Sequence, residues 1–114
     1  YDSNQKKVQL NVICEIELLS IEKALPVGLI ITELLSNSMK HAFKNKKTGV
    51  INIQINKEEN MSKLFYSDNG IGFDFHKPSE KGLGQEIIKG LIDQLDGNVA
   101  TNQNNGFELM IYFK

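Results

Sequence analysis

The stretch Glu33-Leu-Leu-Ser-Asn37-Ser-Met-Lys40-His41 places a row of polar side chains on a predicted helix. Glu33, Asn37 and His41 recur every fourth residue, and Lys40 follows Asn37 by three, so the row lies on one side of an α-helix. A carboxylate can orient or deprotonate a water, an amide oxygen is a ligand for Mg²⁺, and an ammonium neutralises phosphate charge. Taken alone, the row also fits a solvated helix face whose members pair with their neighbours.

Apolar residues give the same predicted helix a core face. They recur with helical spacing at Val27, Ile30, Ile31 and Leu34, and Ser38 and Ala42 continue the series. Proline is accepted in the first turn of a helix, so Pro26 predicts the start. The helix is therefore expected to cover residues 26–43.

Two short glycine-containing clusters follow. Asp68-Asn-Gly70-Ile-Gly72 comes directly after an apolar run, which places a carboxylate at a strand end, where it can accept an exocyclic amine. The two glycines permit close backbone approach, although an ordinary Asp-Asn-Gly turn explains the local sequence as well. Gly82-Leu83-Gly84 precedes a second predicted helix and can expose backbone N–H groups to an anion. By itself this triplet also fits a plain loop entering a helix.

The remaining patterns predict several strands and the second helix. Strands are expected at residues 8–12, 17–21, 50–55, 62–67, 98–101 and 107–113, with the first two paired and the next two forming a hairpin. The helix from Leu83 has its apolar face at Ile87, Leu91 and Leu95, and Gly97 is placed as a left-handed C-cap. Helices separated by hairpins predict an α+β two-layer sandwich, with a mixed, mostly antiparallel sheet and helices on one face.

Length and composition limit the possible functions. The 114 residues are expected to form a single domain, residues 1–114. The 13 basic and 14 acidic residues leave a net charge of −1, so no general attraction for nucleic acid or an anionic membrane is expected. Cys14 is the only cysteine, which excludes a disulfide framework and favours a reducing, cytoplasmic compartment.

In this order, the three clusters resemble the N, G1 and G2 boxes of the ATP-binding catalytic domain of bacterial two-component sensor histidine kinases. This family shares a superfamily with gyrase, Hsp90 and MutL, and the resemblance covers residues 8–113. Residues 25–33 and the ending Lys40-His-Ala-Phe43 look most like the subgroup with a short lid and no separate F box. The resemblance implies a Bergerat-type ATP-binding fold.

The resemblance also implies where adenine would lie. Asp68 would accept the adenine N6 amine, and Gly70 and Gly72 would shape the base pocket. Residues 74–81 would form the ATP lid, and Gly82-Leu83-Gly84 would supply its hinge and its phosphate-facing amides. Two positions depart from the family pattern. Gln85 replaces a leucine, and Phe107 follows Gly106 where a threonine often helps to solvate the adenine-binding aspartate.

By the same resemblance, the polar row on the first helix would handle the phosphates. Asn37 would coordinate the Mg²⁺ that bridges them, and Glu33 would orient the water of the metal or act as a base. Lys40 would contact phosphate, and His41 would line the same wall.

The positions of the histidines indicate where the phosphoacceptor of such a kinase would lie. The only two are His41 in the N box and His76 in the lid, so the phosphoacceptor histidine is expected on a dimerisation domain absent from this chain. A response regulator would then act downstream, and any membrane anchor would belong to the rest of the parent kinase. Two alternatives stay open: a degenerate nucleotide-binding or docking module, and a serine kinase of the anti-sigma-factor type.

Overall fold

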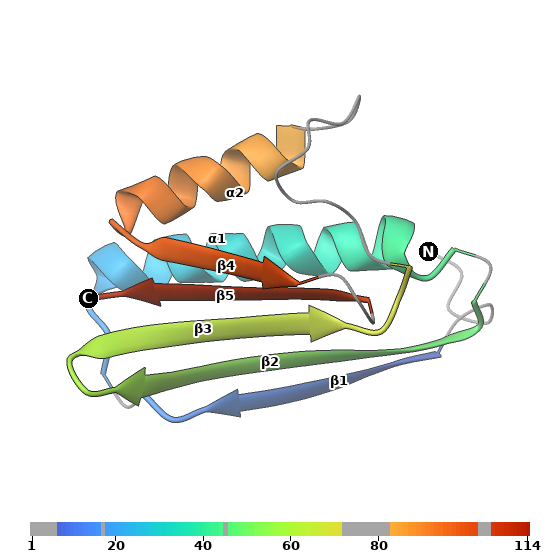
Figure 1. The fold of residues 1–114 in the computed structure, drawn as a ribbon, viewed down its shortest axis with the longest axis horizontal. Coiled ribbons are helices and arrows are strands. Elements are labelled where there is room, and N and C mark those ends of the chain that lie inside the picture. Colours follow the sequence, from blue (N-terminus) through green and yellow to red (C-terminus); the bar gives the residue numbers. More distant parts are fainter. Residues whose placement is uncertain (1–6, 17, 45, 72–82, 103–105) are drawn as a thin grey trace.

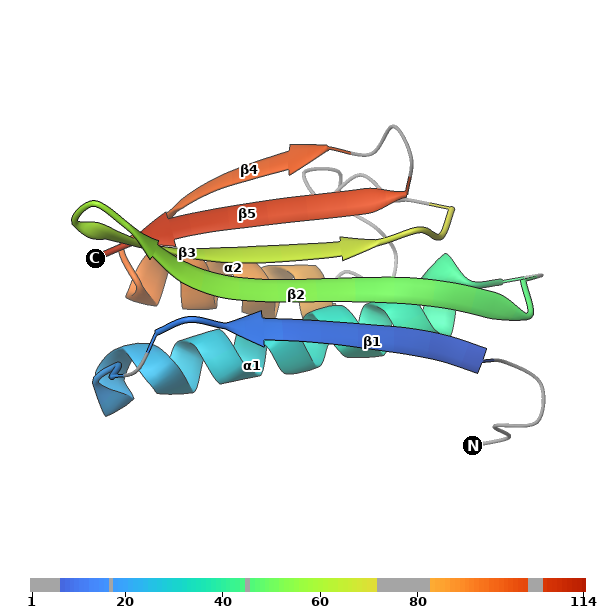
Figure 2. The same ribbon diagram turned by 90° about the horizontal axis from the view of Figure 1, so that it is seen from below.

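A computed structural model of the chain describes residues 7–16, 18–44, 46–71, 83–102 and 106–114. Five strands form one mixed sheet in the order β1-β2-β3-β5-β4, and two helices cover one of its faces (Figures 1 and 2). The elements are β1 (Lys7–Cys14), α1 (Ile21–Asn37), the π-helical turn η2 (Ser38–Ala42), β2 (Thr48–Glu58), β3 (Met61–Asp68), α2 (Leu83–Gln94), β4 (Asn98–Asn102) and β5 (Phe107–Phe113). The predicted α+β two-layer architecture is confirmed.

The N-terminal part differs from the prediction. β1 has no hairpin partner there; it pairs in parallel with β2, with Leu10 opposite Ile51, and α1 makes the connection. The strand predicted at residues 17–21 is wrong, because α1 already begins at Ile21 and Leu18 to Ser20 belong to no strand. Short apolar runs fit a strand and a buried helix equally, and only the fold decides between them.

Helix α1 begins earlier than predicted. The carbonyl of Ser20 accepts the N–H groups of Lys23 at 3.0 Å and Ala24 at 2.8 Å, which starts the helix five residues before Pro26. Pro26 therefore lies inside the helix and is buried against the core. The predicted apolar face is confirmed, since Val27, Ile30 and Leu34 are buried.

The central hairpin is confirmed. β2 and β3 pair antiparallel from Glu58 opposite Met61 to Ile51 opposite Asp68, and the turn between them contains Glu59 with a left-handed φ of 56°. β3 continues the sheet antiparallel to β5, and β5 pairs antiparallel with β4. Asp68 thus ends an interior strand of the sheet, flanked by β2 and β5.

The predicted face of helix α2 is only partly confirmed: Leu95 is buried as predicted and Leu91 packs against the core, but Ile87 does not. Ile88, Ile92 and Leu95 are buried, whereas Ile87 is 40% exposed and Leu91 is half-buried. The predicted C-cap is also displaced by one residue. Asp96 adopts the left-handed conformation, with φ 53°, and the N–H of Gly97 bonds to the carbonyl of Ile92 at 3.1 Å.

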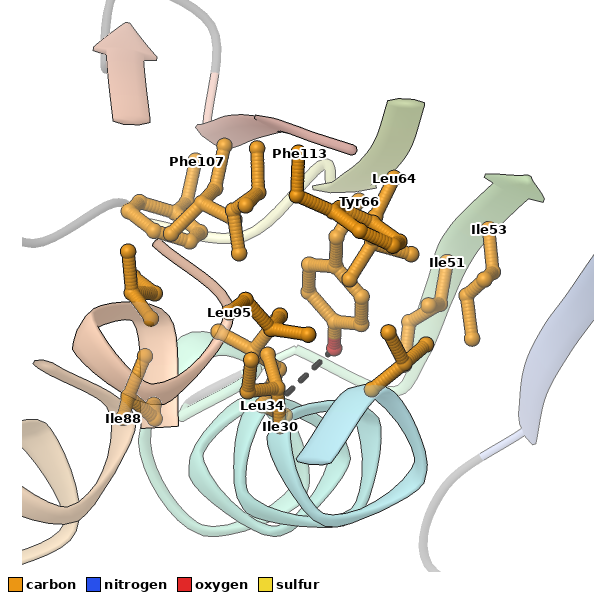
Figure 3. Close-up of a cluster of buried hydrophobic side chains, with 14 of the residues drawn as sticks. Ile30, Leu34, Ile51, Ile53, Leu64, Tyr66, Ile88, Leu95, Phe107 and Phe113 are labelled. Carbon is orange, nitrogen blue, oxygen red and sulfur yellow. Dashed lines mark hydrogen bonds between the residues drawn. The ribbon is translucent and has the colours of Figure 1, made fainter. Parts of the chain in front are cut away.

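The hydrophobic core lies between the sheet and the helices. Figure 3 shows Ile30 and Leu34 of α1, Ile88 of α2 and Leu95, which directly follows α2, converging on side chains from the sheet. The largest fully buried side chains are Tyr66, Phe43, Phe107, Phe113, Ile30, Leu34, Ile51, Leu64, Ile88, Leu95 and Leu109. Within the described segments, no helix is long and apolar enough to cross a membrane.

Candidate functional site

Asp68 is a buried carboxylate fixed at the end of β3. Only 4% of the residue is exposed, and it shares the helix-facing side of the sheet with its partner Ile51. Its Oδ2 accepts a hydrogen bond from the Ser38 hydroxyl at 2.8 Å, and its Oδ1 accepts one from the N–H of Gly70 at 3.0 Å. An ionised carboxylate has about four acceptor positions, so Asp68 keeps capacity for a further donor.

Tyr66 extends this hydrogen-bond network into the core. Its hydroxyl lies 2.5 Å from the Ser38 hydroxyl and donates to the carbonyl of Leu34 at 3.0 Å, the dashed line in Figure 3. With Ser38 donating to Asp68, Tyr66 must share its single proton between the two oxygens near it. Burial, and then the nearby Asp68 carboxylate, raise the pKa of Tyr66, while the Ser38 hydrogen bond acts in the opposite direction. Tyr66 therefore stays a neutral hydroxyl at physiological pH.

Two glycines allow the backbone to close around Asp68. A Cβ at Gly70 would lie 2.3 Å from the carbonyl oxygen of Ala42, and the next amide, Ile71, donates to that oxygen at 2.9 Å. Gly106 has a φ of 105°, and a Cβ there would lie 2.2 Å from the carbonyl oxygen of Asp68. Side chains larger than hydrogen would push the end of η2 and the start of β5 away from the carboxylate.

Asn69 ties the same turn to the start of β2. Its Oδ1 accepts the N–H of Val50 at 2.8 Å, and its own N–H donates to the Val50 carbonyl at 3.2 Å. The Lys46 ammonium donates to the Asn69 carbonyl at 2.9 Å. The residue after Asp68 thus has a structural role that holds the carboxylate in place.

The polar row of the first helix is only partly α-helical. Glu33 and Asn37 lie one turn apart on α1, as predicted, and the structure shows that both are half-buried. Lys40 and His41 lie in η2, so the prediction of one α-helix through residue 43 is wrong at this end. A π-helical turn uses wider i→i+5 bonding, and such turns are frequent at functional sites. Lys40 is exposed, whereas His41 is half-buried and has an interaction partner.

Parts of both glycine-containing clusters lie outside the residues that the structure describes. Gly72 and Gly82, with the whole of the predicted lid, lie outside the described residues. Leu83 and Gly84 form the start of α2, as the predicted helix N-terminus requires. Gln85, at the position where leucine was expected, is 7% exposed and has a partner.

The second departure, Phe107, lies opposite Asp68 in the β3–β5 ladder and is 1% exposed. Its ring brings no hydroxyl to the carboxylate. Ser38 supplies one from the helix side, at 2.8 Å from Oδ2. The Asp68 carboxylate therefore keeps a hydroxyl donor despite the replacement.

Metal binding by protein side chains alone is not supported in the part of the chain that the structure describes. No group of three or more His, Cys, Asp or Glu there could hold an ion. Mg²⁺ usually keeps several waters and takes one or two protein oxygens together with substrate phosphates. A half-buried amide at Asn37, with the Glu33 carboxylate one turn away, fits a metal held in that way.

Ser38 and Tyr66 are the residues that sequence reasoning missed. Ser38 had been placed within the apolar series of the helix, and Tyr66 within an apolar strand. The available signal was a polar group at a core position, because buried hydroxyls almost always have a hydrogen-bond partner. The sequence does not say that these two partner each other across 28 positions.

Comparisons with known proteins identify histidine and serine-protein kinases as relatives of this chain. A blue-light-activated histidine kinase from Erythrobacter litoralis is 28% identical over 91 residues, which are 77% of this chain and 26% of that protein. Sensor histidine kinase ComP of Bacillus subtilis is 33% identical over 94 residues, 79% of this chain and 12% of ComP. Serine-protein kinase RsbW of Bacillus licheniformis is 31% identical over 67 residues, 59% of this chain and 41% of RsbW. This chain thus spans less than half of each relative.

A solved histidine kinase domain of the Erythrobacter litoralis blue-light-activated kinase has the same fold. It superposes with a TM-score of 0.84 at 20% identity, covering 97% of this chain and 56% of that one. The histidine kinase-like ATPase domain family matches residues 7–112, nearly the whole chain. On this match, and with the fold in agreement, the chain belongs to the histidine kinase-like ATPase domain family.

Proposed function

We propose that this chain is the catalytic domain of a larger sensor kinase, which binds Mg²⁺ and ATP and donates the γ-phosphate to a histidine on a dimerisation domain. The observation that carries the proposal is the buried Asp68 carboxylate, oriented by Ser38 and Gly70 with acceptor capacity remaining. Such a carboxylate suits the exocyclic amine of adenine, which offers two N–H donors. The family match and the greater length of the sensor kinase relatives support the rest.

The phosphate-binding part of the proposal rests on α1 and η2. Asn37 would hold Mg²⁺ through its amide oxygen, and Glu33 would orient a water of the metal or act as a base. Lys40, exposed in η2, would contact phosphate, and His41 would line the same wall. When bound, Mg²⁺ supplies charge neutralisation for the phosphates. The chain itself contributes positioning and fixed charge, and no covalent intermediate on this domain is needed.

A serine kinase is the second candidate. It is favoured by the RsbW relative, which is 31% identical over 67 residues and is named as a serine-protein kinase. In that case the phosphate acceptor would be a serine on a separate protein. The same adenine and metal residues would serve both reactions, so the acceptor alone distinguishes them.

Nucleotide binding is tested by thermal unfolding with and without Mg-ATP, on the parent chain and on Asp68→Asn. A ligand at 100 times its Kd stabilises a domain by about 2.7 kcal/mol, which shifts the unfolding temperature by several degrees. The parent should show this shift and Asp68→Asn should lose it. Asp93→Asn is the matched control, because Asp93 is exposed on α2 and should leave the shift unchanged. No shift in the parent at millimolar nucleotide would instead favour a degenerate docking module.

Phosphotransfer is tested by adding labelled ATP and the helical region that precedes this domain in its parent protein. Acid-labile phosphohistidine is the expected product, and it should disappear in Asn37→Ala. Gln94→Ala, an exposed amide on α2, is the control that should stay active. Acid-stable phosphoserine on an added partner protein, with no phosphohistidine, would replace the histidine kinase assignment by the serine kinase one.

A further inference from the structure

β1 forms an edge of the sheet, and among the described strands only β2 pairs with it. The N–H of Lys7 bonds to the carbonyl of Lys47 at 2.8 Å, and that of Glu15 bonds to the carbonyl of Ile55 at 2.8 Å. Since alternate residues of a strand direct their N–H and C=O groups to opposite sides, the odd-numbered residues face β2. The even-numbered residues, from Val8 to Cys14, therefore present their backbone groups at the open edge.

The open edge is also apolar. Leu10 is 50% exposed, Val12 is 58% exposed and Ile13 is 53% exposed. Leu10 and Val12 pair with Ile51 and Ile53, so they lie on the helix-covered side of the sheet and continue the core outward. β1 contains no proline, and its only charge is Lys7 at one end. Long apolar edges without such protection are templates for pairing with another strand.

We propose that β1 is the interface between two copies of this chain, paired antiparallel about a two-fold axis at Asn11. Residues whose backbone N–H and C=O groups point away from β2 must pair with residues of the same kind in the second copy. The register between the two copies can therefore change only in steps of two. The register centred on Asn11 uses all four even-numbered residues of β1. Val8 meets Cys14 of the second copy, and Leu10 meets Val12, so apolar side chains face apolar side chains.

Charge selects the same register. With the axis at Asn11, Lys7 of each copy meets Glu15 of the other, which gives two opposite-charge pairs at the ends of the interface. These are non-hydrogen-bonded positions, where facing side chains of antiparallel strands come closest. A shift of two residues either way would place Lys7 opposite Ile13 or Glu15 opposite Gln9 and lose both pairs. Residues 7–15 of one copy thus match the same residues of a second copy that runs antiparallel to it.

The proposed dimer leaves the candidate nucleotide site accessible. β1 is separated from β3, which carries Asp68, by the whole of β2. Joining the two edges would produce one continuous sheet of ten strands, twice the five in each copy. The inference therefore does not depend on nucleotide binding, and it is tested without nucleotide.

Charge reversal tests the register. Sedimentation velocity over a concentration series should show a monomer–dimer equilibrium for the parent. Lys7→Glu or Glu15→Lys turns both attractive pairs into repulsive ones and should weaken association by about tenfold or more. The combined Lys7→Glu/Glu15→Lys variant restores opposite charges and should recover the parent behaviour. Lys114→Glu, with the same charge change beyond β5, is the control that should leave association unchanged.

Amide exchange tests the edge itself. The amides of Val8, Leu10, Val12 and Cys14 should gain protection as the protein concentration rises. Leu10→Pro removes one outward N–H and no bond to β2, so it should abolish the dimer while circular dichroism stays that of the parent. A parent that stays monomeric throughout the series overturns the proposal. A dimer that ignores both charge reversals, or whose protection appears outside β1, overturns it as well.

Discussion

Ser38→Ala isolates the contribution of one hydroxyl to the geometry of Asp68. Ser38 is 3% exposed and donates to the buried carboxylate at 2.8 Å, and its oxygen also lies 2.5 Å from the hydroxyl of Tyr66. A hydrogen bond to a charged group is worth about 1.5–3 kcal/mol, and burial prevents water from replacing it. We expect the free energy of unfolding to fall by about 2 kcal/mol, and the unfolding temperature by about 8 °C.

Urea unfolding at pH 7 measures this loss. Ser36→Ala is the matched control, because Ser36 is half-buried near the end of α1, two residues before Ser38, and this substitution should lower the free energy of unfolding by no more than about 0.5 kcal/mol. Tyr66→Phe completes a double-mutant cycle. Since the hydroxyls of Ser38 and Tyr66 are hydrogen-bonded to each other, the two substitutions should show a coupling energy of about 0.5–1 kcal/mol. A Ser38→Ala variant as stable as Ser36→Ala, with additive behaviour in the cycle, would refute the account of how Asp68 is held.

Three other predictions concern Tyr66 and the glycines. Burial raises the pKa of Tyr66 above its ordinary 10.0, so the unfolded chain loses this proton first and stability should fall as pH rises above that value. Above that pH, the free energy of unfolding from denaturant titrations should fall less steeply with pH in Tyr66→Phe than in the parent. The difference in slope should be at most about 1.4 kcal/mol per pH unit, and equal slopes would contradict the raised pKa of Tyr66. Gly70→Ala and Gly106→Ala should each destabilise the fold by more than about 1 kcal/mol, because the new Cβ would meet backbone oxygen at 2.3 and 2.2 Å; unchanged urea midpoints would disprove these contacts. Gly90→Ala has open space in α2 and should stabilise it by about 0.5–1 kcal/mol, and a lower thermal midpoint would contradict that.

The overall fold could be predicted because its signals are local. The β2–β3 hairpin and the face of α1 follow from alternation and helical spacing within short windows. The parallel pairing of β1 with β2 is set by tertiary packing across more than 40 positions, as in Leu10 opposite Ile51, and no short pattern announces it. The prediction of the buried face of α2 was wrong in part for a geometric reason. A strict spacing of four drifts around a helix of 3.6 residues per turn, whereas the buried residues combine spacings of four and three.

The candidate site could likewise be predicted from the sequence only in part. Asp68 could be placed at a strand end because the apolar run Leu64-Phe65-Tyr66 comes shortly before it and Asn-Gly follows it, and the structure confirms that placement. Its hydrogen bond with Ser38 spans 30 positions and depends on how α1 crosses the sheet. The change from α- to π-helical bonding after Asn37 likewise had no signal in residue spacing. Sequence patterns therefore placed several residues of the candidate site on the correct helix or strand, and tertiary structure determined how they are held.

The backbone contacts around Asp68 have a consequence for recognition. Hydrogen bonds join three distant segments of the chain around the Asp68 carboxylate. They run from Ile71 to Ala42, between Asn69 and Val50, and from the Ser38 hydroxyl to Asp68. A ligand donor arriving at this carboxylate meets an acceptor that is already oriented, so little conformational entropy remains to be lost on binding. In the proposed function, orienting this carboxylate would therefore add little to the free-energy cost of binding adenine.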